Sequence, residues 1–141
     1  MTNGLHGKTV LITGAGGGMG LATAMGLLKA GANVTLFDLK DAPDGLPAGA
    51  TYVQGDVSDN DAVAAAIAAR ADASGRLDFL INAAGVLWFE RDKSVVEMDL
   101  EVWDQVLAIN LKSVVHTVRH AVPLIKQSGG GAMVHISTID R

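Results

Sequence analysis

The chain has 141 residues, of which 49% are hydrophobic and 18% are charged, and its formal net charge is −4. The 11 Lys and Arg residues are scattered and cysteine is absent, so the sequence offers neither a basic stripe for nucleic acid nor a disulfide or a thiolate metal site. We expect one domain over residues 1–141 with a sizeable core and no nucleic-acid partner.

The sequence carries no targeting or membrane signal. The first eight residues lack the charged-then-apolar order of a signal peptide. No apolar run approaches the roughly 18 residues that a membrane-spanning helix needs. We therefore expect a cytoplasmic protein without membrane attachment.

Apolar periodicity divides the chain into alternating strands and helices. Strands are predicted at 8–13, 33–37, 51–54, 79–82 and 132–137. Helices are predicted at 19–30, from Ser58 or Asp59 to 71, and from 100 to 122, where Pro123 would bend the last turn. The segment 38–50 holds two prolines and two glycines, which indicates a loop or a much reduced helix. This alternation is typical of an α/β fold with a parallel sheet covered on both faces.

A glycine-rich segment, Thr13–Gly20 (TGAGGGMG), joins the first predicted strand to the first helix. Glycine lets a phosphate approach the N–H groups of a helix N-terminus. A Walker loop is excluded because Met19 stands five positions after Gly14 and no lysine follows, and the common pattern G-x-G-x-x-G fails at the same Met19. The segment fits T-G-x-x-x-G-x-G, with Gly14, Gly18 and Gly20; a purely structural turn is the alternative.

Asp38 follows the second predicted strand, 18 residues after Gly20. A carboxylate at about 20 residues from the glycines accepts hydrogen bonds from the ribose 2′-hydroxyl of NAD. The same charge would repel the 2′-phosphate of NADP, and Lys40 is the only basic residue nearby. We therefore expect NAD rather than NADP, with an ordinary turn acid as the alternative.

These residues resemble the short-chain dehydrogenase/reductase family, and the similarity extends from about His6 to the last residue. Two further signatures follow the third and fourth strands, Asp56-Val57 and Asn82-Ala83-Ala84-Gly85, for which helix capping and a bare strand-end turn are the alternatives. The resemblance implies a Rossmann-type doubly wound parallel sheet in the order 3-2-1-4-5, ending here after strand five. It also implies a cofactor site made of Gly14, Gly16, Gly17, Gly18, Met19, Gly20, Asp38, Leu39, Asp56, Val57, Asn82, Ala83, Ala84 and Gly85.

The resemblance also implies candidate catalytic residues. Asn110, a poor helix-interior residue by itself, matches an asparagine that in the family bends its helix and holds a water in a proton relay. The family's catalytic serine falls on Thr138, with Ser137 one place earlier. Its Tyr-x-x-x-Lys pair has no counterpart, because Tyr52 is the one tyrosine and no lysine follows it at the required place. We therefore expect a dinucleotide-binding domain that is incomplete at its C-terminal side and is inactive by itself.

His116 and His120 are spaced to lie one turn apart on the third predicted helix, as two zinc ligands could. No third ligand is evident in the sequence, so we predict no metal site and expect both histidines on the surface or on a dimer face. Trp88-Phe89 could touch a substrate, although a core anchor is at least as good an interpretation.

Together these motifs predict an NAD-dependent oxidoreductase that transfers a hydride between nicotinamide and a small-molecule alcohol or ketone. A non-catalytic module that binds NAD or an adenine nucleotide is the alternative. The resemblance implies a homo-oligomer, a dimer or tetramer, that pairs through the long third helix. In the order 3-2-1-4-5 the fifth strand would be an exposed edge, which favours association or aggregation.

Overall fold

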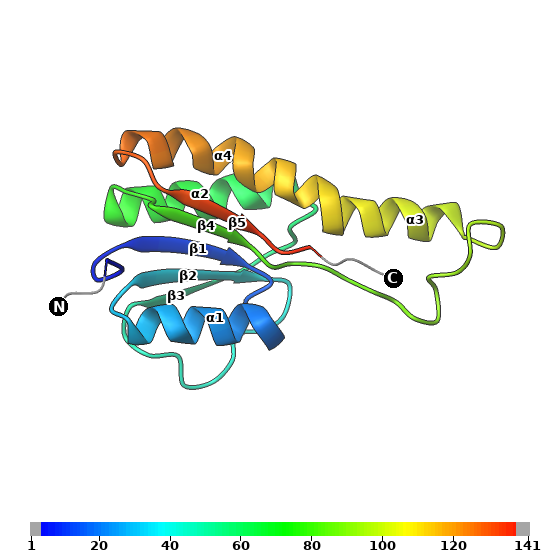
Figure 1. Cartoon of the computed structure of the whole chain (residues 1–141), viewed down its shortest axis with the longest axis horizontal. Helices are drawn as coiled ribbons and strands as arrows, with labels where there is room; N and C mark the ends of the chain where they lie inside the picture. Colours follow the sequence, from blue (N-terminus) through cyan, green and yellow to red (C-terminus); the bar gives the residue numbers. More distant parts are fainter. Residues whose placement is uncertain (1–3, 138–141) are drawn as a thin grey trace.

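Five parallel strands form the centre of the molecule, and helices cover both faces of the sheet (Figure 1). The computed structural model describes residues 4–137. The strands are β1 (Thr9–Thr13), β2 (Asn33–Asp38), β3 (Ala50–Gln54), β4 (Phe79–Asn82) and β5 (Ala132–His135). Their order in the sheet is β3-β2-β1-β4-β5, so the predicted Rossmann-type α/β fold and its strand order are confirmed.

The helices lie in two layers. Helix α1 (Gly18–Lys29) covers one face of the sheet, and α2 (Asn60–Ser74) packs against α4 (Ser113–Gln127) on the other face (Figure 1). Helix α3 (Leu100–Leu107) continues the line of α4 beyond the end of the sheet. None of the helices in residues 4–137 combines the length and apolarity that crossing a bilayer would require.

Each face of the sheet has its own core, because successive side chains of a strand point to opposite sides. Val10 and Ile12 of β1 pack in one cluster with Leu28 of α1. Leu11, between them, packs in the other cluster with Ile67 of α2 and with residues of α4. All five residues of β1 are buried, as its continuous β-branched run predicts.

The boundaries of the elements differ slightly from prediction. The segment after β2 is a loop up to β3 and contains no helix. Helix α2 begins after Asp59, whose carboxylate accepts hydrogen bonds from the N–H groups of Asp61 (2.9 Å) and Ala62 (3.2 Å), and it runs to Ser74 rather than Ala71. Strand β5 ends at His135, two residues before the predicted end.

The predicted long helix is interrupted, which periodicity did not indicate. A π-helical segment, Ala108–Lys112, separates α3 from α4. Asn110 lies in this wider turn, where its side chain bonds to the chain after β4, and such one-turn π segments often occur at functional sites. Helix α4 continues past Pro123 to Gln127.

The edge of the sheet at β5 is exposed. All four residues of β5 are exposed, and within residues 4–137 the strand pairs with β4 alone. Large apolar side chains on α3, the π-helical segment and α4, including Leu100, Leu111 and Val115, are exposed as well. The predicted exposed edge is therefore present in the fold.

Candidate functional site

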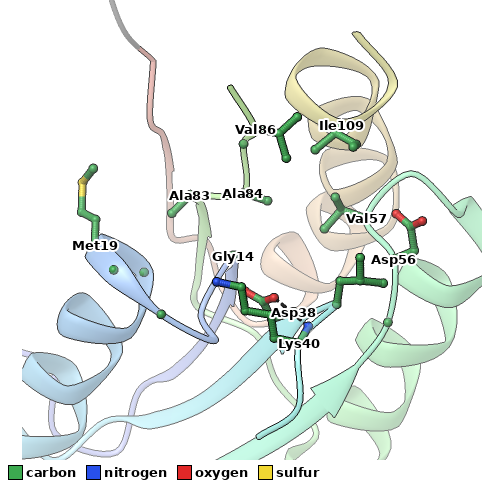
Figure 2. Close-up of a pocket in the computed structure, with 16 residues that line it drawn as sticks. Gly14, Met19, Asp38, Lys40, Asp56, Val57, Ala83, Ala84, Val86 and Ile109 are labelled. Carbon is green, nitrogen blue, oxygen red and sulfur yellow. Dashed lines mark hydrogen bonds between the residues drawn. The ribbon is translucent and has the colours of Figure 1, made fainter. Parts of the chain in front are cut away.

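A cleft of about 490 Å³ opens at the carboxyl ends of the strands, next to the N-terminus of α1 (Figure 2). It lies where the strand order reverses between β1 and β4, the usual ligand position in open α/β sheets. Its volume falls within the roughly 300–1,000 Å³ of small-molecule and cofactor sites. The lining residues are Gly14, Gly17, Gly18, Met19, Gly20, Asp38, Leu39, Lys40, Gly55, Asp56, Val57, Ala83, Ala84, Gly85, Val86 and Ile109.

The predicted cofactor residues gather in this cleft, with two exceptions. Gly16 and Asn82 do not line it, whereas all the others do. Sequence reasoning assigned no role there to four residues that do line it: Lys40, Gly55, Val86 and Ile109. Each stands within two residues of a predicted one, so adjacency was the available signal. What these residues bind stays a prediction.

The protein's own backbone accounts for two of the five glycines in the glycine-rich segment. A methyl group on Gly14 would lie 2.6 Å from the backbone of Ala84, and Gly14 also has a φ of +67°, which favours glycine. A methyl group on Gly20 would overlap the carbonyl oxygen of Gly14. These glycines allow β1, α1 and the chain after β4 to pack closely together. We call this junction, at Gly14 and Gly20, the corner.

Gly17 and Gly18 instead border open space. The nearest described atom to a methyl group on Gly17 would be Nζ of Lys40 at 3.7 Å, and none lies within 4 Å of one on Gly18. Gly17 is the N-cap of α1, no side chain of the described residues caps the helix, and its first turn holds no acidic residue. The N–H groups of this turn are therefore available to an anion, which the helix dipole also favours.

Asp38 stands at the end of β2, beside the glycine-rich segment. Its carboxylate accepts hydrogen bonds from the backbone N–H groups of Gly16 (2.8 Å) and Lys40 (2.9 Å). A carboxylate can accept about four hydrogen bonds, so Asp38, which lines the cleft, can accept further ones. Gly16 has no room for a side chain, because a methyl group there would lie 2.9 Å from the carboxyl carbon of Asp38.

Tyr52 of β3 supports the turn Asp38–Lys40, which follows β2. Its hydroxyl donates a hydrogen bond to the carbonyl oxygen of Lys40 at 2.8 Å. Burial, together with the nearby carboxylates of Asp38 and Asp41, raises the pKa of the Tyr52 phenol above its ordinary value. The hydroxyl therefore stays protonated and remains a donor, which holds the Asp38–Lys40 turn in place.

Asp56 and Val57 form the wall opposite Met19 in Figure 2. The carboxylate of Asp56 accepts hydrogen bonds from the N–H (2.8 Å) and the hydroxyl (2.7 Å) of Ser58. These two bonds form a local turn. The helix cap is Asp59, so capping does not explain Asp56.

Asn82 ends β4 in a buried position away from the cleft. Its Oδ1 accepts a hydrogen bond from the hydroxyl of Thr117 (2.8 Å), and its Nδ2 lies 3.0 Å from Nδ1 of His135. It therefore connects β4 to α4 and β5. The cleft wall at this strand end comes instead from Ala83 and Ala84, whose N–H groups bond to Thr13.

Asn110 links the π-helical segment to the chain after β4. Its Oδ1 accepts from the N–H of Val86 at 2.7 Å, and its Nδ2 donates to the carbonyl oxygen of Val86 at 2.9 Å. Ser137 follows β5 and is exposed, whereas Thr138 lies outside the described residues. The described atoms thus give Asn110 a positioning contact, and the catalytic roles of all three residues stay predictions.

The expectation of surface histidines is wrong for His116. This side chain is buried, and its Nδ1 lies 3.1 Å from the carbonyl oxygen of Val57. His120 is half-buried and bonds Asn60.

The core interpretation is wrong for Phe89, which is 83% exposed, while Trp88 is half-buried and stacks on the guanidinium of Arg91 at 4.7 Å. In residues 4–137 no group of three His, Asp or Glu side chains is arranged to hold a metal ion.

Comparisons with known proteins agree with this geometry. The family model of short chain dehydrogenases matches residues 8–140. D-beta-hydroxybutyrate dehydrogenase of Rhizobium meliloti is 37% identical over an alignment that covers 93% of this chain and 54% of that protein. Aldohexose dehydrogenase of Thermoplasma acidophilum, solved in ligand-free form, gives a TM-score of 0.88 at 26% identity over 95% of this chain and 50% of its own. The structure of an NADH-dependent reductase complexed with NAD gives a TM-score of 0.82 at 29% identity, over 94% of this chain and 60% of that one.

These matches share one feature of length. The chain spans about half the length of the curated relatives that it matches. The family model nevertheless covers nearly all of the chain, from the first strand onward. The chain belongs to the short-chain dehydrogenase family.

Proposed function

We propose that this chain binds a nicotinamide dinucleotide in the cleft and is the cofactor-binding part of an oxidoreductase. The observation that carries the proposal is the uncapped N-terminus of α1 at Gly17 and Gly18, which borders the same cleft as the carboxylate of Asp38. An anion-binding helix end beside a ribose-binding acid fits a dinucleotide, whose pyrophosphate and adenosine ribose are neighbours. The NAD complex of a structural relative supports this choice of ligand.

The chain's own residues would bind and orient the cofactor. The N–H groups of the first turn of α1 would hold the pyrophosphate, and Ala83 to Val86 with Ile109 would border the nicotinamide end. When bound, the nicotinamide supplies or accepts a hydride. Asn110, Ser137 and Thr138 would serve the reacting end, Asn110 by fixing Val86 at the wall.

Asp38 favours NAD over NADP. The two backbone hydrogen bonds that it accepts fix its carboxylate at the cleft, where it can accept from a ribose hydroxyl. A 2′-phosphate at the same place would meet a like charge. Lys40 is the only basic side chain among the described lining residues, and its Nζ reaches toward Gly17 of the phosphate-binding turn.

A small-molecule alcohol or ketone is the proposed substrate class. Two of the relatives are named as dehydrogenases of a hydroxy acid and of an aldohexose, both of which carry alcohol groups. We also propose that the protein forms a homo-oligomer, because α3, the π-helical segment and α4 expose Leu100, Leu111 and Val115 respectively.

A non-catalytic nucleotide-binding module is the second candidate. The observation that favours it is the position of Tyr52, whose hydroxyl is bonded to Lys40 at the adenosine end of the cleft and so is not placed for proton transfer at the nicotinamide. Saturable NAD binding with no NADH formed from any alcohol would support the module.

Asp38→Asn tests the proposal, with Asp41→Asn as the matched control. Asp41 lies in the same loop and bonds Gln54, but it does not line the cleft. Calorimetric titration should show that the native chain binds NAD at least about tenfold more tightly than NADP, and that Asp38→Asn weakens NAD binding about tenfold, the effect of one charged hydrogen bond. Asp41→Asn should bind both as the native chain does. Equal native affinities would overturn the NAD preference, and binding of neither would overturn the proposed function.

A further inference from the structure

His116 and His120 lie one turn apart on α4, but their side chains contact different parts of the chain. The Nδ1 atom of His116 lies 3.1 Å from the carbonyl oxygen of Val57, in the loop between β3 and α2. The Nε2 atom of His120 lies 2.9 Å from Oδ1 of Asn60, the first residue of α2. The pair therefore connects α4 to this loop and to the helix that follows it.

The direction of the His116 hydrogen bond follows from its partner. A carbonyl oxygen only accepts, so the Nδ1 of His116 must carry the proton. His116 is only 7% exposed, and a hydrogen bond in such a site is stronger than in water. The structure therefore implies that Nδ1 of His116 carries a proton and donates it to Val57.

Val57 belongs to the wall of the cleft, with Gly55 and Asp56 before it. At the start of this loop the N–H of Gly55 donates to the carbonyl oxygen of Asp38 at 2.8 Å. In residues 4–137 the other hydrogen bonds of the loop are local, within Asp56 to Asp59 and the first turn of α2. Among these described residues, His116 is thus the side chain that hydrogen-bonds to the loop from a distant part of the chain.

We propose that His116 is a positioning residue for the adenosine half of the dinucleotide. By holding the carbonyl group of Val57, it fixes the Asp56–Val57 wall of the cleft. This wall lies next to Asp38, the proposed ribose acceptor, because the N–H of Gly55 bonds to the carbonyl oxygen of Asp38, so the adenine attached to that ribose would lie against it. This inference rests on the proposed function, because it needs the cofactor in this cleft. His120 has no such role, since Asn60 does not line the cleft.

Two substitutions separate the hydrogen bond from simple packing. In His116→Asn the amide nitrogen stands close to the position of Nδ1 and can still donate to Val57. In His116→Gln the amide nitrogen stands close to the position of Nε2 and cannot. His120→Asn is the matched control, because it removes the bond to Asn60 one turn away.

Calorimetric titration with AMP, NAD and nicotinamide mononucleotide gives the readout. His116→Gln should weaken AMP and NAD binding about fivefold, as loss of one hydrogen bond does, and leave the mononucleotide unchanged. His116→Asn should stay within about twofold of the native chain, and so should His120→Asn. A role in packing alone would lower the melting temperature of His116→Gln without this selective loss of AMP affinity.

The outcomes distinguish the role of His116 from the proposed cofactor-binding function on which it rests. If the native chain binds neither NAD nor AMP, the proposed function fails. If the native chain binds both and His116→Gln binds AMP equally well, this inference alone is overturned. Should the variants not fold, the ¹⁵N chemical shifts of His116 in the native chain decide: a proton on Nδ1 supports the contact with Val57, and an unprotonated Nδ1 overturns it.

Discussion

Strands β1 and β5 belong to one sheet and have comparably apolar sequences, yet their surroundings are opposite. Every residue of β1 is buried between two neighbouring strands and two helical layers, while every residue of β5 is exposed at the edge. Met133 and Val134 of β5 are 41% and 48% exposed, whereas Val10 and Ile12 of β1 are fully buried. An apolar strand therefore contributes to stability only when other elements cover it.

Most of the cleft is formed by residues that follow the buried strands of the sheet. The glycine-rich segment follows β1, and Asp38 ends β2, whose central residues are all buried. The reacting end of the proposed site, at Ser137, follows the exposed β5. We therefore expect changes near β1 and β2 to affect stability strongly, and changes in β5 to affect it little.

Asp78→Ala should have the largest effect, because the buried carboxylate of Asp78 ties β1 to the segment before β4. It accepts a hydrogen bond from the N–H of Thr9 in β1 (2.9 Å) and pairs with Lys8 and Arg76. Removing the carboxylate should lower the free energy of unfolding by about 4 kcal/mol in urea titrations. Substitution of the exposed Asp44 by Ala is the control and should change little.

The same carboxylate predicts an acid dependence. Burial raises the pKa of Asp78, but the hydrogen bonds from Arg76, from the N–H of Thr9 and from Lys8 outweigh it, so the pKa lies below its ordinary value. The contribution to stability is therefore complete above about pH 4 and is lost as the pH falls through the lowered pKa. Unfolding titrations of the native chain and Asp78→Ala should converge in acid; parallel curves would contradict this role.

Gly20→Ala should have the next largest effect, and Gly26→Ala should have the opposite sign. Both glycines lie in α1, where alanine favours the helix. A methyl group on Gly20 would overlap the carbonyl oxygen of Gly14, whereas no described atom lies within 4 Å of one on Gly26. Urea unfolding should show a loss of about 3 kcal/mol for Gly20→Ala and a gain of about 0.5–1 kcal/mol for Gly26→Ala. Equal stability of the two variants would mean that the corner is not tightly packed.

The smallest expected effects on the free energy of unfolding are those of Val34→Ala and Val134→Ala. These two variants compare the covered side of the sheet directly with its exposed edge. Val34 in β2 is fully buried, and Val134 in β5 is 48% exposed. Truncation of Val34 should cost about 2 kcal/mol, and truncation of Val134 less than about 0.5 kcal/mol. A loss at Val134 as large as that at Val34 would show that β5 is covered in solution, for example by a second copy of the chain.

Features encoded within one stretch of sequence were predictable. The strands, the glycine-rich segment and the strand order follow from local periodicity and from the family resemblance, and residues such as Asp38 and Gly85 line the cleft as expected. The contacts that sequence reasoning missed join residues far apart in the chain. His116 bonds to Val57, 59 residues away, and Asn82 bonds to His135, 53 residues away. Polar side chains of these types serve many roles, and only the three-dimensional arrangement shows which partner each one meets.

The close packing at Gly14 and Gly20 has a consequence for the speed and cost of nucleotide capture. The corner takes its shape from contacts with the chain after β4 and within itself, and Ala15 is held by a hydrogen bond to Phe37 (3.3 Å), so its conformation is set before any ligand arrives. Ordering the backbone of one residue costs roughly 1–2 kcal/mol of conformational entropy, which a preorganised corner does not lose on association. If the proposed dinucleotide binds here, its association should follow a single fast phase whose rate constant rises linearly with nucleotide concentration, without a slower rearrangement of the loop.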